Sequence, residues 1–423
     1  MGGAICPTAY SIIKGIIKMK KSFLKVIALV MAAAMLFSLT VSAADDFSAQ
    51  PENTLQFGED GKFRILQIAD TQDDMFPSPG MIKMIETAVE KYEPDLVIFT
   101  GDNTGTVDLK IDAKYAIKAI IDPIADAGIP FTFVFGNHDA ENVSKETHFS
   151  AYRSYENCLA YDADPEIYGM GTHNLTIKSS DGTKVAYNLW MFDSNMYDEN
   201  GNYDYIHDDQ LDWYVNTSNA LKAENGGEVV PSIAFQHIVP YEIKEYVVET
   251  PELDPSGYTD KNTGKHYALN PEYAEEGSIL REYPCPSAFH GAQMSKFVQQ
   301  GDVNAVFVGH DHVNDYIVHT RMNAADGAAI DIVNTPGASF QSYGDDEMRG
   351  CRIIDLDESN PWEYETFSPT FYDVVGDTEE NRALAYVSDN IVWYYVSFIA
   401  RIIPFFGEQL QQMLISAIYN AFK

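Results

Sequence analysis

Phe131-Thr132-Phe133-Val134-Phe135-Gly136-Asn137-His138-Asp139 is the stretch from which the fold can be argued. A continuous run of apolar, strand-forming residues stops at Gly136, and three polar side chains able to bind metal ions follow at once. A short apolar run bounded by a turn residue predicts a fully buried strand. Open α/β folds place their chemistry in the loops where such strands end. The stretch therefore predicts a buried strand that delivers Asn137, His138 and Asp139 to a functional site.

Four other segments have the same form, an apolar run followed by polar side chains. They end at Asp70-Thr71-Gln72, Gly101-Asp102-Asn103, His237 and Gly309-His310-Asp311-His312. Each of them alone also fits a turn or a structural histidine with satisfied hydrogen bonds. Because all five occur at the ends of predicted strands, we interpret them as parts of one site.

The order of the predicted elements indicates an α/β core. Strands at residues 63–69, 95–100 and 131–135 alternate with helical spacing at 81–89 and 111–120, which favours right-handed crossovers. The later elements expected are a hairpin (172–178 and 185–192), a helix capped by Asp208 or Asp209 that ends at Asn225, and strands at 230–236, 303–308, 330–334 and 352–356. Residues 241–292 lack periodicity, and a stretch of that length is usually functional or mobile.

Residues 1–43 have the features of a secretory signal peptide. Met19-Lys20-Lys21 opens a basic segment, Val26 to Leu39 is almost continuously apolar, and Val41-Ser42-Ala43 fits a small-x-small cleavage site. Met19 is the expected start, since residues 1–18 add nothing that a signal peptide needs. A membrane anchor is the alternative, but the short apolar core and the small residues favour cleavage. We therefore expect a secreted, extracellular or cell-surface protein.

The charge balance is strongly acidic. The 423 residues carry a net charge of −35, and removing the five lysines of residues 1–43 leaves 23 basic against 63 acidic residues, or −40. Such a surface repels nucleic acids and anionic membranes, so we expect no nucleic-acid partner. A bound metal ion would supply the local positive charge that an anionic substrate needs. Outside the leader, Cys158, Cys285 and Cys351 allow at most one disulfide, which excludes a disulfide scaffold.

The candidate site combines carboxylates, imidazoles and amide oxygens. These ligands suit divalent or trivalent ions such as Mn, Fe or Zn. One carboxylate between two ions, with further ligands on each side, makes a two-metal site about 3.5–4 Å across. Such a site activates water, holds a phosphoryl group and stabilises charge on the leaving oxygen. The residues therefore predict a binuclear metal centre.

These motifs resemble the calcineurin-like metallophosphoesterases, a superfamily that includes purple acid phosphatases, phosphodiesterases, nucleases and 5′-nucleotidases. The resemblance covers residues 63 to 356. Within it, Phe235-Gln236-His237-Ile238 and Val308 to Tyr316 are similar to the purple acid phosphatase-like branch of plants and fungi. The resemblance implies an α/β fold, a four-layer β-sandwich flanked by helices, with the metal site at the C-terminal ends of the strands.

The resemblance also implies a role for each site residue. It places Asp70, Gln72 and His312 on the first metal, Asn137, His237 and His310 on the second, and Asp102 between the two. It further implies that His138 acts near the leaving oxygen and that Asp139 orients the His138 ring.

Two positions depart from the family pattern. Most members have His where this chain has Gln72, whose neutral amide oxygen is a weaker ligand. The first metal should therefore be held less tightly or have its shell completed by water. Purple acid phosphatases have a metal-bound Tyr three residues after the bridging Asp, where this chain has Gly105. The resemblance therefore argues against the purple subtype.

The expected function is that of a secreted, metal-dependent phosphoric ester hydrolase, a phosphatase or phosphodiesterase that cleaves a small phosphorylated substrate by attack of a metal-bound hydroxide. The alternative is a non-catalytic metal- or ligand-binding surface protein of the same fold, but the presence of Asp102 and His138 favours the enzyme. A third interpretation is an interaction protein that acts through its tail. A nuclease is disfavoured because no basic groove is visible. Substrate contacts are expected in residues 140–170 or 241–292.

The chain is expected to have four parts, a signal peptide (1–43), a linker (44–60), a catalytic domain (61–375) and an apolar, helical C-terminal tail (376–423). Arg401, Pro404 and Glu408 interrupt the apolar residues of the tail, which disfavours a membrane-spanning helix of about 20 apolar residues. Packing on the catalytic domain, self-association and peripheral membrane binding through residues 385–423 remain open.

Overall fold

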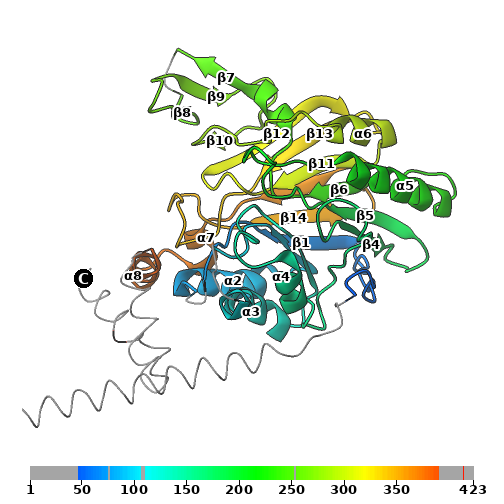
Figure 1. Cartoon of the computed structure of the whole chain (residues 1–423), viewed down its shortest axis with the longest axis horizontal. Helices are drawn as coiled ribbons and strands as arrows, with labels where there is room; N and C mark the ends of the chain where they lie inside the picture. The colour runs from blue at the N-terminus through cyan, green and yellow to red at the C-terminus, as the bar shows by residue number, and fades with distance from the viewer. Residues whose placement is uncertain (1–45, 75–76, 106–109, 252–253, 390–412, 414–423) are drawn as a thin grey trace, which may run out of the picture. The chain divides into compact units, whose positions relative to one another are not determined.

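A computed structural model describes residues 46–74, 77–105, 110–251, 254–389 and 413. The predicted leader and residues 390–412 and 414–423 of the tail lie outside the described residues. Within the unit that begins at Phe47, two β-sheets lie face to face and helices cover their outer faces (Figure 1).

The first sheet has five strands in the order β15-β14-β1-β2-β3. Its strands are β1 (Lys62–Ile68), β2 (Leu96–Thr100), β3 (Phe131–Val134), β14 (Arg352–Asp357) and β15 (Tyr364–Phe367). Strands β1, β2 and β3 are parallel, and helices α2 (Pro79–Tyr92) and α3 (Lys110–Asp126) connect them. The α/β pattern predicted for this part of the sequence is therefore confirmed.

The second sheet has seven strands in the order β10-β12-β13-β11-β6-β5-β4. Its strands are β4 (His173–Lys178), β5 (Val185–Met191), β6 (Ser232–Phe235), β10 (Ile279–Leu280), β11 (Val303–Val308), β12 (Asn314–Asn323) and β13 (Ala329–Asn334). Strands β5, β6, β11 and β13 are parallel to their neighbours in this series. Helices α5 (Asp208–Glu224) and α6 (Gln293–Gln300) cover the outer face of this sheet (Figure 1).

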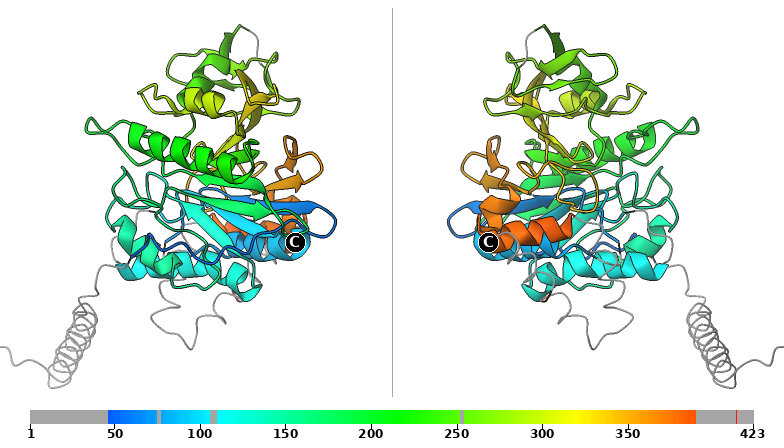
Figure 2. Two further views of the ribbon diagram at one scale, coloured as in Figure 1. Left: turned by 90° about the vertical axis from the view of Figure 1, so that its right-hand side faces the viewer. Right: turned by 90° about the vertical axis from the view of Figure 1, so that its left-hand side faces the viewer.

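Side-chain alternation along the strands separates the layers. Phe63 and Ile65 of β1 point between the two sheets, where Phe307 of β11 joins the same buried cluster. Leu66 and Ile68 point to the opposite face and pack in the cluster that α2 and α3 share with the first sheet. A strand buried on both faces reads as a continuous apolar run, which is why the sequence showed no alternation here. The layers run from helices through two sheets to helices (Figure 2), and this confirms the expected four-layer fold.

The segment without periodicity, residues 241–292, contains regular structure that the sequence did not reveal. A 3-10 helix η1 (Tyr241–Tyr246) leads into a small sheet of β7 (Val247–Thr250), β9 (His266–Leu269) and β8 (Tyr258–Thr259). Strands of two to four residues are too short to show a period of two. For the same reason of length, the sequence missed β15, α4 (Lys145–Tyr152), α6 and α7 (Phe371–Val375).

The start of α5 also differs from the expectation. The residue before the helix is His207, so neither Asp208 nor Asp209 is the cap. The backbone N–H of His207 donates to Gln210 Oε1 at 2.8 Å, which satisfies a group that the helix itself leaves unpaired. The two aspartates lie in the first turn instead, where their charge favours the positive end of the helix dipole.

The last described helix, α8 (Glu379–Ser388), packs on α2. Ser388 Oγ accepts a hydrogen bond from the Gly80 N–H at 2.8 Å, and Ala385 is buried in the cluster between α2 and the first sheet. Over the described residues, no helix combines the length and apolar character needed to cross a membrane. Cys158, Cys285 and Cys351 are all free thiols.

Candidate metal centre

The five segments with polar ends meet where the C-terminal ends of β1, β2, β3, β6 and β11 come together. Two groups of buried side chains are each arranged to hold an ion. One is Asp70, Asp102 and His312, and the other is Asp102, His237 and His310. Within each group the candidate ligand atoms lie within 4.8 Å of one another. Asp102 belongs to both groups, the position that a bridging carboxylate occupies.

The backbone at these residues adopts a conformation that L-residues rarely take. Among the described residues, six non-glycine residues have positive φ, and four of them are Asp70 (53°), Gln72 (36°), Asp102 (47°) and His310 (75°). Such a conformation costs on the order of 1–3 kcal/mol per residue and persists only where surrounding contacts enforce it. Here the Asp70 N–H donates to the Gly101 carbonyl at 3.1 Å, and the Gln72 N–H donates to the Asp102 carbonyl at 2.9 Å. The loops of β1 and β2 therefore hold each other in the geometry that presents their carboxylates.

Glycines in the motifs make room for the ligands. A Cβ at Gly136 would lie 2.2 Å from both the backbone nitrogen and Oδ1 of Asp102. A Cβ at Gly309 would lie 2.7 Å from Oδ2 of Asp70. The sequence therefore needs glycine before Asn137 and before His310 because each carboxylate packs directly on the next loop.

His237 presents a lone pair to the second group. Its Nδ1 donates to the Thr100 carbonyl at 2.9 Å, because a carbonyl oxygen can only accept, and this leaves Nε2 as the ligand atom. That Nε2 lies 3.3 Å from Asp102 Oδ2, 3.1 Å from Asn137 Oδ1 and 3.2 Å from His310 Nδ1. Four electron-pair donors thus converge on one point, an arrangement that a cation would satisfy.

The pKa shifts in this cluster have the same origin. Burial would lower the pKa of His237, but the carboxylates of Asp102 and Asp70 raise it to about 10. Burial opposes ionisation of Asp102, yet the charge of His237 holds the pKa of Asp102 below its ordinary value. Burial, followed by the neighbouring His237, lowers the pKa of His310 to about 3. The carboxylates therefore require positive charge beside them, which either a proton or a metal ion can supply.

The first group is organised in the same way. His312 Nδ1 donates to the Tyr343 carbonyl at 2.8 Å, and its Nε2 faces Asp70 Oδ1 at 3.4 Å. The Tyr343 ring stacks on the His312 ring with 4.2 Å between centroids and 9° between planes. Gln72 Nε2 donates to Asp102 Oδ2 at 3.0 Å, and Gln72 Oε1 is a buried atom without a hydrogen-bond partner.

The residues present fit a pair of metal ions. The donor set consists of carboxylate, imidazole and amide groups, and the two hydrogen-bonded imidazoles have the tautomer that binding requires. His310 Nε2 is a further buried atom without a partner, as is Gln72 Oε1. When bound, two such ions would neutralise the carboxylates, bind phosphate oxygens and activate water.

His138 lies at the edge of this cluster, and its orientation differs from the expectation. Its backbone N–H donates to Asp102 Oδ1 at 2.8 Å, while its ring, 37% exposed, turns outward. His138 Nδ1 lies 2.9 Å from Glu141 Oε1, so Glu141 orients the ring rather than Asp139.

Asp139 is buried and accepts the backbone N–H groups of Gly136 and Thr104 at 2.8 and 2.9 Å. Burial, followed by the charge of Asp102, raises the pKa of Asp139 to about 7. Asp139 thus links the β2 and β3 loops, because it follows a tight turn that points its side chain inward.

The sequence analysis missed several residues that contact the ligands or support the loops around them. They are Gln67, Glu141, Tyr197, Tyr203 and Tyr343. Gln67 bridges the two sheets beneath the site, with Nε2 donating to Thr100 Oγ1 at 3.0 Å and to the Val308 carbonyl at 3.2 Å. Asn137 Nδ2 donates to the Tyr197 hydroxyl at 3.0 Å, and the Tyr203 ring meets His310 edge-on. Tyr197 and Tyr203 lie outside both segments in which substrate contacts were expected. The feature of the sequence that could have drawn attention to these two tyrosines is the tyrosine-rich loop after the apolar run 185–192.

A model of the calcineurin-like phosphoesterase family matches residues 63–314, more than half of the chain. The chain belongs to this family. The match includes every strand end that contributes to the two ligand groups, from Asp70 to His312.

Relatives in Arabidopsis thaliana point to the purple acid phosphatase-like branch. "Probable inactive purple acid phosphatase 14" is 25% identical over 326 residues, 69% of this chain and 74% of its own. "Probable inactive purple acid phosphatase 29" is 28% identical over 338 residues, 72% of this chain and 79% of its own. Among solved structures, the purple acid phosphatase PPD1 of yellow lupin aligns with 77% of this chain and 56% of its own, at 13% identity and a TM-score of 0.41.

The position of the tyrosine ligand in purple acid phosphatases is occupied differently in this calcineurin-like phosphoesterase. A Cβ at Gly105 would lie 2.9 Å from the backbone carbonyl oxygen of Gln72. Any side chain at residue 105 would therefore push against the loop that carries Asp70 and Gln72. The backbone itself thus disfavours a tyrosine here, in agreement with the argument against the purple subtype.

Proposed function

We propose that this chain is a secreted, metal-dependent phosphoesterase that hydrolyses phosphate mono- or diesters at a binuclear metal centre. The observation that carries the proposal is the sharing of Asp102 between two buried ligand groups. A structural metal site needs one closed set of ligands, whereas two adjacent sets around one carboxylate suit phosphoryl transfer. Asp70, Asp102, His312 and Gln72 would hold the first ion. Asp102, Asn137, His237 and His310 would hold the second.

The chain's own residues then have distinct tasks. The carbonyls of Thr100 and Tyr343 fix the tautomers of His237 and His312, and the Tyr343 ring also stacks on the His312 ring. Glu141 accepts from His138 Nδ1, so a His138 ring protonated on both nitrogens would give its Nε2 proton to the departing alcohol oxygen and remain as the neutral ring that donates to Glu141. The bound ions supply Lewis-acid stabilisation of the phosphate and activation of the attacking water.

The alternative is a non-catalytic, metal- or ligand-binding surface protein of the same fold. Two relatives carry the word "inactive" in their names, and Gln72 replaces the usual histidine, which favours this alternative. A screen of monoesters, diesters and nucleotides against the mature protein, reconstituted with Mn, Zn or Fe, separates the two functions. We expect turnover that follows metal content. Stoichiometric metal binding without turnover of any ester would establish the alternative.

Gln72 offers a test of the first metal position. We expect Gln72→His to tighten the weaker of two metal-binding events by roughly tenfold to a hundredfold, the usual effect of changing one group at a metal site, without moving the stronger event. Calorimetric titration of the metal-free proteins measures both affinities, and the exposed Gln56→His is the control for an added imidazole. Equal weak-site affinities in wild type and Gln72→His would show that Gln72 only hydrogen-bonds Asp102 or a water.

We further propose that the protein is exported and that its C-terminal tail binds a membrane surface or a second copy of the chain. The basic and apolar pattern of residues 1–43 supports export, and the apolar residues of 385–423 support peripheral membrane binding or self-association. The acidic surface supports a small phosphorylated substrate rather than a nucleic acid. Sizing and vesicle sedimentation of the chain with and without residues 390–423 separate the two roles of the tail.

A further inference from the structure

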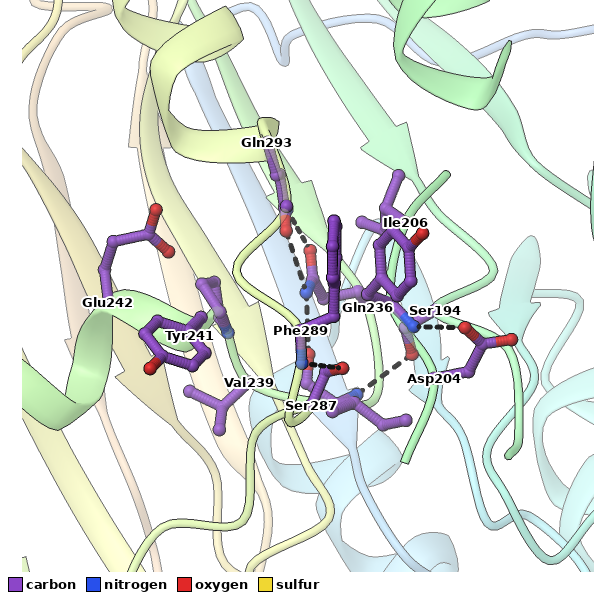
Figure 3. A pocket seen from close by; sticks show the side chains of 14 residues that line it. Ser194, Asp204, Ile206, Gln236, Val239, Tyr241, Glu242, Ser287, Phe289 and Gln293 are labelled. Carbon is purple, nitrogen blue, oxygen red and sulfur yellow. Dashed lines mark hydrogen bonds between the residues drawn. The ribbon is translucent and has the colours of Figure 1, made fainter. Parts of the chain in front are cut away.

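A pocket with aromatic walls is built from residues of the segments 194–206, 236–242 and 287–293 (Figure 3). The space between its walls, open solvent included, is about 350 Å³. The rings of Tyr205, Tyr241 and Phe289 line it together with the apolar side chains of Ile206 and Val239. None of these side chains belongs to either ligand group, so the metal centre does not explain them.

Two segments run from the metal centre into the pocket. Residues 238–242 follow His237 directly, and they form one wall of the pocket. Tyr203 meets His310 with 4.4 Å between ring centroids, and Tyr205, two residues further on, lines the pocket. The backbone on either side of the ligand groups thus leads to the pocket walls, which makes the pocket a candidate site for the rest of a substrate whose phosphate lies at the ligand groups.

An aromatic stack ends at the pocket with one ring open to solvent. Phe289 is 55% exposed, and its ring centroid lies 4.4 Å from that of Tyr205. Tyr205 stacks on His207 at 4.4 Å and 9°, and His207 stacks on Tyr168 at 3.8 Å and 16°. An exposed Phe forgoes the stabilisation that burial of its ring would give the fold. Its outward position, at the end of a preformed stack, suits one more planar ring.

The charges in the pocket exclude the phosphate itself. Its lining residues, all within the described part of the chain, include no Lys or Arg. They do include the buried carboxylates of Asp204 and Glu242, which lie 2.9 Å from ring nitrogens of His207 and His290. These carboxylates repel an anionic group, whereas the aromatic and aliphatic side chains offer surface to an uncharged ring. The nearby Lys244 Nζ is held over the Tyr241 ring, 4.2 Å from its centroid, and donates to the Ser287 carbonyl at 3.3 Å. The pocket thus suits the part of an ester that carries no phosphate.

We propose that this pocket binds the alcohol part of the substrate and selects alcohols that carry an aromatic ring, which stacks on Phe289. The inference rests on the proposed phosphoesterase function and names its substrate class. The phosphate lies at the ligand groups around Asp102, and the ring occupies the open end of the stack formed by Phe289, Tyr205, His207 and Tyr168.

The test compares two primary-alcohol esters, 2-phenylethyl phosphate and butyl phosphate, whose leaving groups are chemically similar. We expect wild type to prefer the phenylethyl ester by up to about tenfold in kcat/KM, mainly through KM, since one aromatic contact is worth about that much. Phe289→Leu should bring the ratio of the two kcat/KM values close to one, and Phe289→Tyr should retain the preference. Phe367→Leu is the matched control, because Phe367 is 46% exposed on the edge strand β15.

Binding measurements keep this inference separate from the proposed function. Calorimetry with 2-phenylethylphosphonate and butylphosphonate reports the pocket even where neither ester is hydrolysed. A phenyl preference in binding that Phe289→Leu removes supports the pocket, and absent turnover would then count only against catalysis. Equal affinities for the two phosphonates, or a preference that survives in Phe289→Leu, would overturn the assignment.

Discussion

Replacing Asp102 with alanine should abolish hydrolysis and lower the metal content at both positions together. Asp102 is the one carboxylate that belongs to both ligand groups, and its oxygens also accept from the His138 N–H and from Gln72 Nε2. Loss of a bridging ligand removes several kcal/mol of charge stabilisation, so we expect kcat/KM to fall by about 10³-fold or more. Metal analysis of the purified protein and kinetics on an aryl phosphate measure the two effects.

The Asp102→Ala variant needs a control for correct folding, because Asp102 also holds the loops together. Asp102→Asn keeps the shape of the side chain and one acceptor oxygen, which can still accept the His138 N–H, but removes the charge that two cations share. Asp326→Ala, in the exposed turn between β12 and β13, controls for the loss of an aspartate elsewhere. If Asp102→Ala and Asp102→Asn fold like wild type and keep both metals and turnover, Asp102 is not the bridging ligand.

The second large effect is expected at His138. His138→Ala should keep its metals and lose about 10²–10⁴ in kcat, because the ring lies outside both ligand groups and is placed to protonate the leaving oxygen. The loss should be greatest for alkyl esters, whose alkoxide needs a proton, and smallest for aryl esters with acidic phenols. A variant that loses metal along with rate would instead identify His138 as a ligand.

Replacing Glu141 tests whether the carboxylate beside His138 acts through the His138 ring. Glu141→Gln removes the carboxylate that lies 2.9 Å from His138 Nδ1 but keeps a group of the same size. We expect a decrease of roughly tenfold to a hundredfold in kcat with little change in KM, and no further loss when the change is added to His138→Ala. His319→Ala is the control, since His319 is an exposed histidine on β12 that pairs with Asp331 at 2.8 Å and belongs to neither ligand group. Additive losses in the double variant would mean that Glu141 acts independently of His138.

The sequence was sufficient to predict the strands that carry the site and which side chains stand at their ends. Residues 63–69, 95–100, 131–135 and 303–308 were predicted as buried strands, and each corresponds to a strand of the structure within one residue at either end. This succeeded because burial on both faces makes a strand continuously apolar, and a glycine with polar neighbours marks its end. The convergence of the ends then follows from parallel strands, whose C-terminal ends lie on one edge.

Only the tertiary structure decided how each side chain is used, because the contacts that decide it join residues far apart in sequence. The carbonyl that fixes the tautomer of His237 belongs to Thr100, 137 residues earlier. The assignment of Asp139 to His138 failed because a tight turn points Asp139 inward and brings Glu141 to the ring. Tyr203 reaches His310 from a loop whose richness in tyrosine does not reveal which ring meets the ligand. Residue type and spacing therefore determined which chemistry this chain can carry, and packing between distant loops determined the orientation of each group and the pocket beside them.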